Sequence, residues 1–252
     1  MITLTSDFGS PYPAAMKGVI LQRTDAQLID VAHDLPRQDV RAAAFWLREV
    51  IPHFPPAVHL VVVDPGVGTD RAAIVVRVGD HAFVAPDNGV VLPAARALDG
   101  DIEIFEVEYE NVASSTFHGR DVFAPAAGDV HDIGIDNIAD LDHVTPVDDY
   151  VDLTFPEPEL DGDTARGEIL VVDDFGNAIT NIPGDFLEDA TDATVNGKRT
   201  PVEPSYAHVD NGERLVTVAS HENVELAVNQ GRGDDAFDVT TGTSVEVERH
   251  TS

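Results

Sequence analysis

The sequence predicts an α/β fold for the first part of the chain and a smaller, antiparallel all-β domain for the rest. Three observations carry this prediction. Apolar runs alternate with helical stretches up to about residue 150. The Pro- and acid-rich stretch TFPEPELDGDTARG then occupies 154–167, and only short strand-like runs follow it. We therefore place an N-terminal domain at 1–155 and a C-terminal domain at 165–252.

Strand and helix patterns follow one another from the first residue. MITLT at 1–5 is strand-like, AAMKGVILQR at 14–23 is helical, and AQLIDV at 26–31 is a second strand. Asp39 begins a further helix that extends to residue 51, and one face of this helix is expected to pack against the sheet. That face consists of Val40, Ala43, Ala44, Leu47 and Ile51.

The next elements are a buried strand and a hairpin. VHLVVV at 58–63 is nearly continuous Val and Leu, which is typical of a strand buried on both faces. The runs at 72–78 and 81–86 are separated only by Gly79 and Asp80, which predicts a hairpin. Strands interleaved with helices in this order predict a mostly parallel central sheet, with ligand sites at the carboxyl ends of its strands.

The C-terminal part contains only short strands. An Asn-Gly pair inside the third of them marks a tight turn. Strands of this length and spacing predict a small antiparallel barrel or sandwich. The runs lie at 168–174, 178–182, 193–202, 214–220, 224–229 and 243–249.

Acidic residues outnumber basic ones by 46 to 15, which gives a formal net charge of −31. Such a charge repels nucleic-acid phosphates and anionic membranes, so neither is an expected partner. The acidic residues are dispersed along the chain, and Lys198 is the only lysine after Lys17. We therefore expect a halophilic source.

Cysteine is absent from the sequence, which excludes disulfides, thiolate metal sites and cysteine nucleophiles. Apolar runs stay well short of the roughly 18 residues that a membrane span needs. The N-terminal stretch MITLTSDFGS has neither the basic nor the apolar region of a signal peptide. We expect a cytoplasmic protein.

Polar residues gather where the predicted strands end, in the stretches SDFG, DPGVGTDR, PDNG and STFHGRD. A purely structural interpretation is open for each stretch, because Pro, Gly and Asp are turn and cap residues. In that interpretation Asp121 caps the following helix, and His118 and Arg120 are solvated. The candidate residues are Asp7, Asp64, Arg71, Asp87, Asn88, Phe117, His118, Arg120 and Asp121.

A metal site is the main alternative that uses the same residues. Asp64, Asp87, His118 and Asp121 offer oxygen and nitrogen ligands for Zn²⁺ or Mn²⁺. The sequence has no HExxH pattern and no second histidine at short ligand spacing, and Arg71 would lie beside the cation. We therefore expect no metal.

Seven motifs occur in one order along the chain: LTSDFG, MKG, VVDPGVGTDR, PDNG, SSTFHGRDVFAPAA, DDFGNAITNI and VELAVNQG. Together they resemble the S-adenosylmethionine (SAM) hydroxide adenosyltransferase family, which is related to fluorinase and chlorinase enzymes. The resemblance implies an N-terminal α/β domain and a C-terminal antiparallel β-barrel. It also implies a homotrimer in which SAM binds between one subunit's N-terminal domain and its neighbour's C-terminal domain. No cofactor is implied, because SAM is the substrate.

The resemblance further implies that Asp64, Arg71 and His118 act as a catalytic set, which separates family members that use water from those that use halide. The halogenating relatives carry tyrosine at the position of Asp64 and lack the histidine. The implied reaction is attack of water or hydroxide on the ribose C5′, which gives adenosine and L-methionine. An Asp–Arg pair fixes the geometry, and a neutral histidine can accept a proton near pH 7. A SAM or adenosine sensor with incidental turnover, and halide-dependent substitution on SAM, are the alternatives.

Substrate-binding residues carry over from the same motifs. The resemblance implies that Asp7 holds the ribose hydroxyls and that Phe117 and Gly119 line the ribose and C5′ region. In the C-terminal domain it implies contacts to the methionine ammonium, adenine and the methionine carboxylate. The residues concerned are Asp173 for the ammonium, Phe175 and Asn177 for adenine, Ser220 for the carboxylate and Asn229 for adenine. The stretch SPYPAA at 10–15 departs from the family pattern close to the ribose site.

Overall fold

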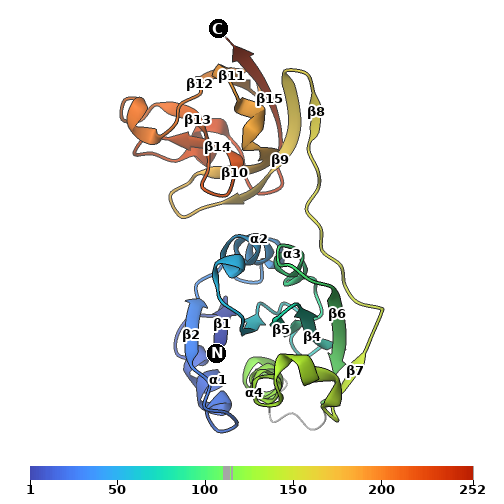
Figure 1. Cartoon of the computed structure of the whole chain (residues 1–252). Coiled ribbons are helices and arrows are strands. Elements are labelled where there is room, and N and C mark those ends of the chain that lie inside the picture. The colour runs from blue at the N-terminus through green and yellow to red at the C-terminus, as the bar shows by residue number, and fades with distance from the viewer. Residues whose placement is uncertain (110–113, 115, 252) are drawn as a thin grey trace. The chain divides into compact units, whose positions relative to one another are not determined.

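The computed structural model describes residues 1–109, 114 and 116–251 (Figure 1). It divides into two compact units, Met1–Thr154 and Phe155–Ser252. In the described part of the chain, no helix has the length and apolar character needed to cross a membrane. The predicted α/β fold with a smaller antiparallel C-terminal barrel is confirmed.

The described part of the N-terminal unit contains a seven-stranded sheet in the order β2-β1-β3-β5-β4-β6-β7. Strands β2, β1, β3 and β5 are parallel, whereas β5, β4, β6 and β7 pair antiparallel, so the sheet is mixed. The antiparallel part begins with the predicted hairpin. The strands are β1 (Ile2–Ser6), β2 (Leu28–Ala32), β3 (Val58–Val62), β4 (Ala73–Val78), β5 (His81–Pro86), β6 (Ile102–Val107) and β7 (Val144–Pro146).

Helices cover both faces of this sheet (Figure 1). On one face α1 (Tyr12–Ile20) and α4 (Ala124–Ile133) bury their apolar residues against β1 and β3. On the other, α2 (Val40–Val50) and α3 (Leu92–Arg96) pack on alternate residues of β3, β4 and β5, such as Val61, Val76 and Phe83. Burial on both faces explains why β3 (VHLVV) is almost continuously apolar, whereas β1 (ITLTS) alternates Ile and Leu with Thr although all five of its residues are buried. Short 3₁₀ turns occupy Ile51–His53 and Ile135–Asp140.

Helix α2 forms where the sequence predicts it. The Asp39 carboxylate accepts a hydrogen bond from the Ala42 amide at 2.9 Å and so caps the helix. Ala43 and Leu47 lie in the buried cluster beneath it. Helix α1 begins at Tyr12, two residues before the predicted start, because Pro13 is compatible with the first turn of a helix.

The described part of the C-terminal unit contains an eight-stranded antiparallel sheet in the order β12-β11-β15-β9-β10-β14-β13, with β8 paired to β9. A bridge between Val202 and Val216 brings its two ends together, so the sheet is a nearly closed barrel. The strands are β8 (Glu159–Asp161), β9 (Thr164–Val172), β10 (Ala178–Pro183), β11 (Ala190–Val195), β12 (Lys198–Pro201), β13 (Arg214–Val218), β14 (Asn223–Val228) and β15 (Ser244–Thr251). Short helical segments are Gly184–Leu187, Tyr206–His208 and α5 (Gly233–Phe237).

Turns and apolar residues shape this barrel. Asn196 and Gly197 both have positive φ, 46° and 79°, as the predicted hairpin turn requires. The second half of the predicted linker differs from expectation, because β8 and the start of β9 form a hairpin there. Gly162 supplies the positive φ of that turn. Alternate residues of the strands fill the interior with a separate apolar core.

Candidate active site

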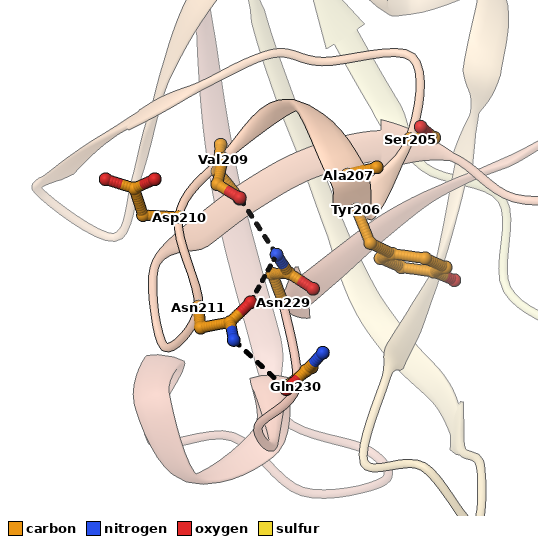
Figure 2. Close-up of a pocket in the computed structure, with 8 residues that line it drawn as sticks. All are labelled: Ser205, Tyr206, Ala207, Val209, Asp210, Asn211, Asn229 and Gln230. Atoms are coloured by element: carbon orange, nitrogen blue, oxygen red, sulfur yellow. Dashed lines mark hydrogen bonds between the residues drawn. The ribbon is translucent and has the colours of Figure 1, made fainter.

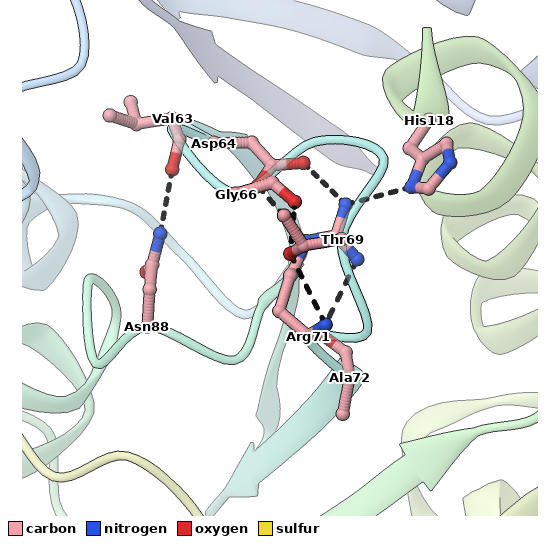
Figure 3. A network of polar contacts seen from close by, with 8 residues as sticks. All are labelled: Val63, Asp64, Gly66, Thr69, Arg71, Ala72, Asn88 and His118. Carbon is pink, nitrogen blue, oxygen red and sulfur yellow. Dashed lines mark hydrogen bonds and ion pairs between the residues drawn. The ribbon is translucent and has the colours of Figure 1, made fainter. Parts of the chain in front are cut away.

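A compact ion-pair cluster lies beyond the carboxyl end of β3 (Figure 3). Arg71 Nε donates to Asp64 Oδ1 at 2.9 Å, and Arg71 Nη2 donates to Asp64 Oδ2. The same Nη2 lies 3.0 Å from His118 Nδ1. Only 10% of the Arg71 side chain and 6% of the Asp64 side chain are exposed. The structure thus brings together the three predicted catalytic residues, although His118 is separated from Asp64 by 54 positions in the sequence.

The turn DPGVG builds the frame of this cluster. A Cβ atom on Gly66 would lie 3.1 Å from Arg71 Cγ, so a glycine here lets the arginine fold back over the turn. Thr69 Oγ1 donates to the Gly66 carbonyl at 2.6 Å. Asn88 donates from Nδ2 to the Val63 carbonyl at 2.9 Å and fixes the exit of the strand. The turn is therefore structural, and it also holds Arg71 in place.

The hydrogen-bond pattern fixes the protonation of His118. A guanidinium only donates, so Nδ1 of His118 accepts from Arg71 and the neutral ring carries its hydrogen on Nε2. Burial, followed by the nearby Arg71 charge, lowers the pKa of His118 from 6.5, against opposite contributions from Asp64 and Asp121. At pH 7 His118 is therefore a neutral ring whose Nε2–H is a hydrogen-bond donor.

Helix α4 is preceded by a π-helical turn, Gly119–Phe123, and this overturns the simple capping interpretation. His118 is not solvated, because only 4% of it is exposed. Asp121 lies inside the π turn and caps no helix. Its carboxylate instead accepts from Arg120 Nε at 2.6 Å and Nη2 at 2.8 Å, and this pairing lowers the pKa of Asp121.

Gly119 stands where this turn approaches α1. A Cβ atom there would lie 2.9 Å from Met16 Sδ, 3.2 Å from the Phe117 ring and 3.3 Å from Val62 Cγ1. A side chain would force these neighbours apart. The Arg71 guanidinium lies over the ring of Phe123, 4.8 Å from its centroid, so the π turn also supports the ion-pair cluster.

Asp7 follows β1, directly beside the end of β3, because Ser6 pairs with Val62 in the sheet. Asp7 is 8% exposed, and its Oδ2 accepts from the Gln38 amide at 2.6 Å. Further out, the ring of Phe117 makes an edge contact with that of Tyr12, at a centroid distance of 5.4 Å.

Sequence reasoning missed Tyr12, which is 53% exposed beside these predicted residues. Phe8, which follows Asp7 in the chain, makes edge contacts with both rings, 6.0 Å from Tyr12 and 6.1 Å from Phe117. The available signal was the phenylalanine within two of the four polar stretches, SDFG and STFHGRD. The residues of the N-terminal unit that are predicted to contact the ribose and C5′ thus lie together beyond the carboxyl ends of the parallel strands.

The C-terminal candidates fall into two groups. Asp173 and Asn177 close the turn between β9 and β10: the Asn177 amide donates to Asp173 Oδ1 at 2.8 Å and Nδ2 donates to Oδ2 at 3.0 Å. Phe175 on the same turn is 80% exposed. Asn229 follows β14 at the end where Leu226 pairs with Ala178, and so lies at the same end of the barrel as the turn between β9 and β10.

Ser220 is not part of this group. It lies exposed before β14, at the end where Asn223 pairs with Pro183. The length of the strand therefore separates Ser220 from Asn177 within one chain. Figure 2 shows the pocket around Asn229, where Nδ2 donates to the Val209 carbonyl at 2.8 Å.

The four residues of the alternative metal site have other partners. Asp64 and His118 both pair with Arg71, Asp121 pairs with Arg120, and Asp87 Oδ1 accepts from the Val151 amide at 2.8 Å. Across residues 1–109, 114 and 116–251, no group of three or more His, Asp or Glu side chains is arranged to hold a metal ion.

Comparison with known proteins identifies relatives over the whole chain. The model of the SAM hydroxide adenosyltransferase N-terminal domain matches residues 2–138, and that of the C-terminal domain matches residues 167–246. Proteins named (R)-S-adenosyl-L-methionine hydrolase from Salinispora tropica and Thermus thermophilus are 40% and 36% identical to the chain. These two alignments cover 98% and 96% of the chain, and 97% of each relative. An uncharacterized conserved protein from Thermotoga maritima has a solved structure with a TM-score of 0.84 and 34% identity, over 99% of this chain and 100% of that one.

Proposed function

The chain belongs to the SAM hydroxide adenosyltransferase family, and from this premise we propose that it hydrolyses SAM to adenosine and L-methionine. The observation that carries the proposal is the Asp64–Arg71–His118 cluster beside Asp7, at the carboxyl ends of two neighbouring parallel strands. Open sheets of this kind bind ligands at that edge. The names of the relatives from Salinispora tropica and Thermus thermophilus support the same reaction.

The proposed reaction is an in-line displacement at the ribose C5′. The water oxygen forms a bond to C5′ while the bond from C5′ to sulfur breaks. The electron pair of that bond goes to sulfur, so L-methionine leaves as a neutral thioether, and the water releases one proton. The sulfonium loses its positive charge on the way to the transition state, and a site that solvates cations poorly therefore favours the reaction. Because the leaving group is already activated, we propose that no cofactor takes part.

Each residue of the cluster has a different role toward the attacking water in this proposal. Nδ1 of His118 is engaged by Arg71, so Nε2–H is the group that His118 offers to a water oxygen. Asp64 is the anion of the cluster, and we assign to it the water hydrogen that is released. Arg71 holds the carboxylate with two hydrogen bonds and keeps it oriented. Water held by His118 and Asp64 in this way directs its free lone pair at C5′.

The remaining residues bind the substrate in this proposal. Asp7 accepts from the ribose hydroxyls, and Phe117 and Gly119 line the ribose. We further propose a homotrimer in which the N-terminal unit of one copy and the C-terminal unit of its neighbour share one SAM. The C-terminal contacts are then Asp173 to the ammonium, and Phe175, Asn177 and Asn229 to adenine. Ser220 lies at the other end of β14 from the Asp173 turn and does not reach the carboxylate of the same methionine, so that predicted contact is not part of the proposal.

The test is incubation of the purified protein with SAM in high salt, followed by chromatography. We expect adenosine and methionine in equal amounts, and a halogenated nucleoside in chloride would contradict the proposal. His118→Ala should abolish adenosine formation. The matched control His53→Ala, at an exposed position before the amino end of β3 and so at the opposite end of the strand from the cluster, should leave it unchanged. Undiminished turnover by His118→Ala would contradict the assigned cluster. Tight SAM binding without any turnover by the unaltered protein would instead indicate a sensor.

A further inference from the structure

Glu225 in β14 is a buried carboxyl group that the hydrolysis of SAM does not use. Only 4% of it is exposed, and its Oε1 accepts from the hydroxyl of Tyr206 at 2.6 Å. Burial raises the pKa of Glu225, and the negative charge of Asp173 adds to this, although the hydrogen bond from Tyr206 acts in the opposite direction. A carboxyl group held at this cost is expected to have a role. Its contact with Tyr206 indicates what that role is.

Tyr206 connects Glu225 to Asn177. The Tyr206 ring lies at the rim of the pocket in Figure 2, and its hydroxyl oxygen is 3.4 Å from Asn177 Nδ2. Since the Tyr206 hydrogen is donated to Glu225, the oxygen must accept from Asn177. The hydrogen bonds therefore run in one direction, from Asn177 through Tyr206 to Glu225.

This direction settles which side of the Asn177 amide faces a ligand. The Asp173 carboxylate also only accepts, and it receives the other Nδ2 hydrogen at 3.0 Å. Both amide hydrogens are thus occupied inside the protein, and the described part of the chain places no donor on Oδ1. Asn177, which is 7% exposed, presents an acceptor and no donor.

We infer that Tyr206 and Glu225 are specificity-determining positioning residues, which hold Asn177 so that the site accepts a purine with a 6-amino group and rejects one with a 6-oxo group. The inference rests on the proposed function, in which the base is the adenine of SAM. The exposed ring of Phe175, two residues away on the same turn, offers the flat surface on which a purine stacks. A 6-oxo group would place its oxygen against Oδ1, where neither atom can donate.

Adenosine and inosine are the probes, because they differ at this position and need no chemical step. Binding of each to the full-length protein is measured by calorimetry in high salt. We expect adenosine to bind at least about 30-fold more tightly than inosine, as for other sites whose buried polar groups would be left unpaired. In Tyr206→Phe one Nδ2 hydrogen of Asn177 loses its acceptor and can be donated to a 6-oxo group, so this ratio should fall about tenfold or more. Equal binding of the two nucleosides by the unaltered protein would overturn the inference.

Two matched variants separate positioning from general damage. Tyr150→Phe removes a hydroxyl in the N-terminal unit and should preserve the ratio. Glu225→Gln keeps an oxygen that can accept from Tyr206, so it should keep the ratio within about threefold and act as the conservative rescue. A Tyr206→Phe protein that unfolds at the same temperature as the unaltered one and keeps its full preference for adenosine would overturn the inference. Nucleoside binding is measured apart from SAM turnover, so the two proposals can fail separately.

Discussion

The two units hold their polar residues in different ways. In the N-terminal unit, Asp64, Arg71 and His118 form a closed ion-pair cluster that is almost wholly buried. In the C-terminal unit, hydrogen bonds join Asp173 and Asn177 within one turn, beside the exposed ring of Phe175. Buried charges in fixed geometry suit chemistry, because they are already oriented when reaction begins. Directed hydrogen bonds beside an aromatic surface suit recognition, since they distinguish donors from acceptors.

Replacing Arg71 should lower SAM turnover far more than adenosine binding, and it is the largest effect that we expect. Arg71→Ala leaves Asp64 buried without its partner, which costs about 3–5 kcal/mol in comparable sites. Adenosine formation should fall by about a thousandfold or more, because neither the carboxylate nor His118 keeps its orientation. Adenosine binding at the C-terminal residues should change less than about threefold. Thermal unfolding, SAM turnover and calorimetry measure the three effects, and a parallel loss of binding would show that the two regions are not independent.

Acid should destabilise the N-terminal unit and spare the C-terminal one. His59, which is fully buried between Thr3 and His81, has its pKa lowered by burial to about 3. The unfolded residue binds a proton near 6.5, so protons favour the unfolded state as the pH falls below that value. Between pH 6.5 and pH 4 the free energy of unfolding should therefore fall by on the order of 3 kcal/mol.

The contribution of Glu225 to stability depends on pH in the opposite direction. Its raised pKa means that the folded form binds a proton more tightly than the unfolded form, so its contribution to stability is largest below 4.5 and is lost as the pH rises through the folded pKa. Calorimetric unfolding at pH 7.5, 5.5 and 4.5 should show the N-terminal transition moving to lower temperature first. His59→Gln should reduce that movement, whereas the exposed control His208→Gln should not. A C-terminal unit that unfolds first in acid would contradict this assignment.

A smaller effect should come from Gly119, where the close approach of the π turn to α1 leaves no space for a side chain. Gly119→Ala places a Cβ atom 2.9 Å from the buried Met16 sulfur, and the displacement should cost about 1–3 kcal/mol. Turnover should fall by about tenfold, because His118 is the preceding residue. Gly18→Ala is the matched control, since a Cβ atom on Gly18 meets nothing within 4 Å. Equal melting temperatures for the two variants would show that the π turn adapts without cost.

The elements that could be predicted are those with a local signal. The helix after Asp39 has a cap and one apolar face, and the turn at Asn196 and Gly197 has the residues that positive φ favours. The π turn at Gly119–Phe123 has no such signal, because it depends on the contacts of Gly119 with Met16 and Val62. Beyond the predicted hairpin, the antiparallel pairing of β6 and β7 was likewise hidden, since apolar runs look alike in parallel and antiparallel strands.

The residue pattern alone specifies the fold class, the family and the members of the N-terminal cluster, because these depend on residue types at particular positions along the chain. Which atoms meet depends on the folded structure. It placed His118 Nδ1 on Arg71 and so moved the free hydrogen to Nε2, and it directed the Asn177 amide through Tyr206 to Glu225. It also set Ser220 at the far end of β14 from Asn177. Hydrogen-bond direction and strand register are properties of atoms in contact, which a residue pattern does not specify.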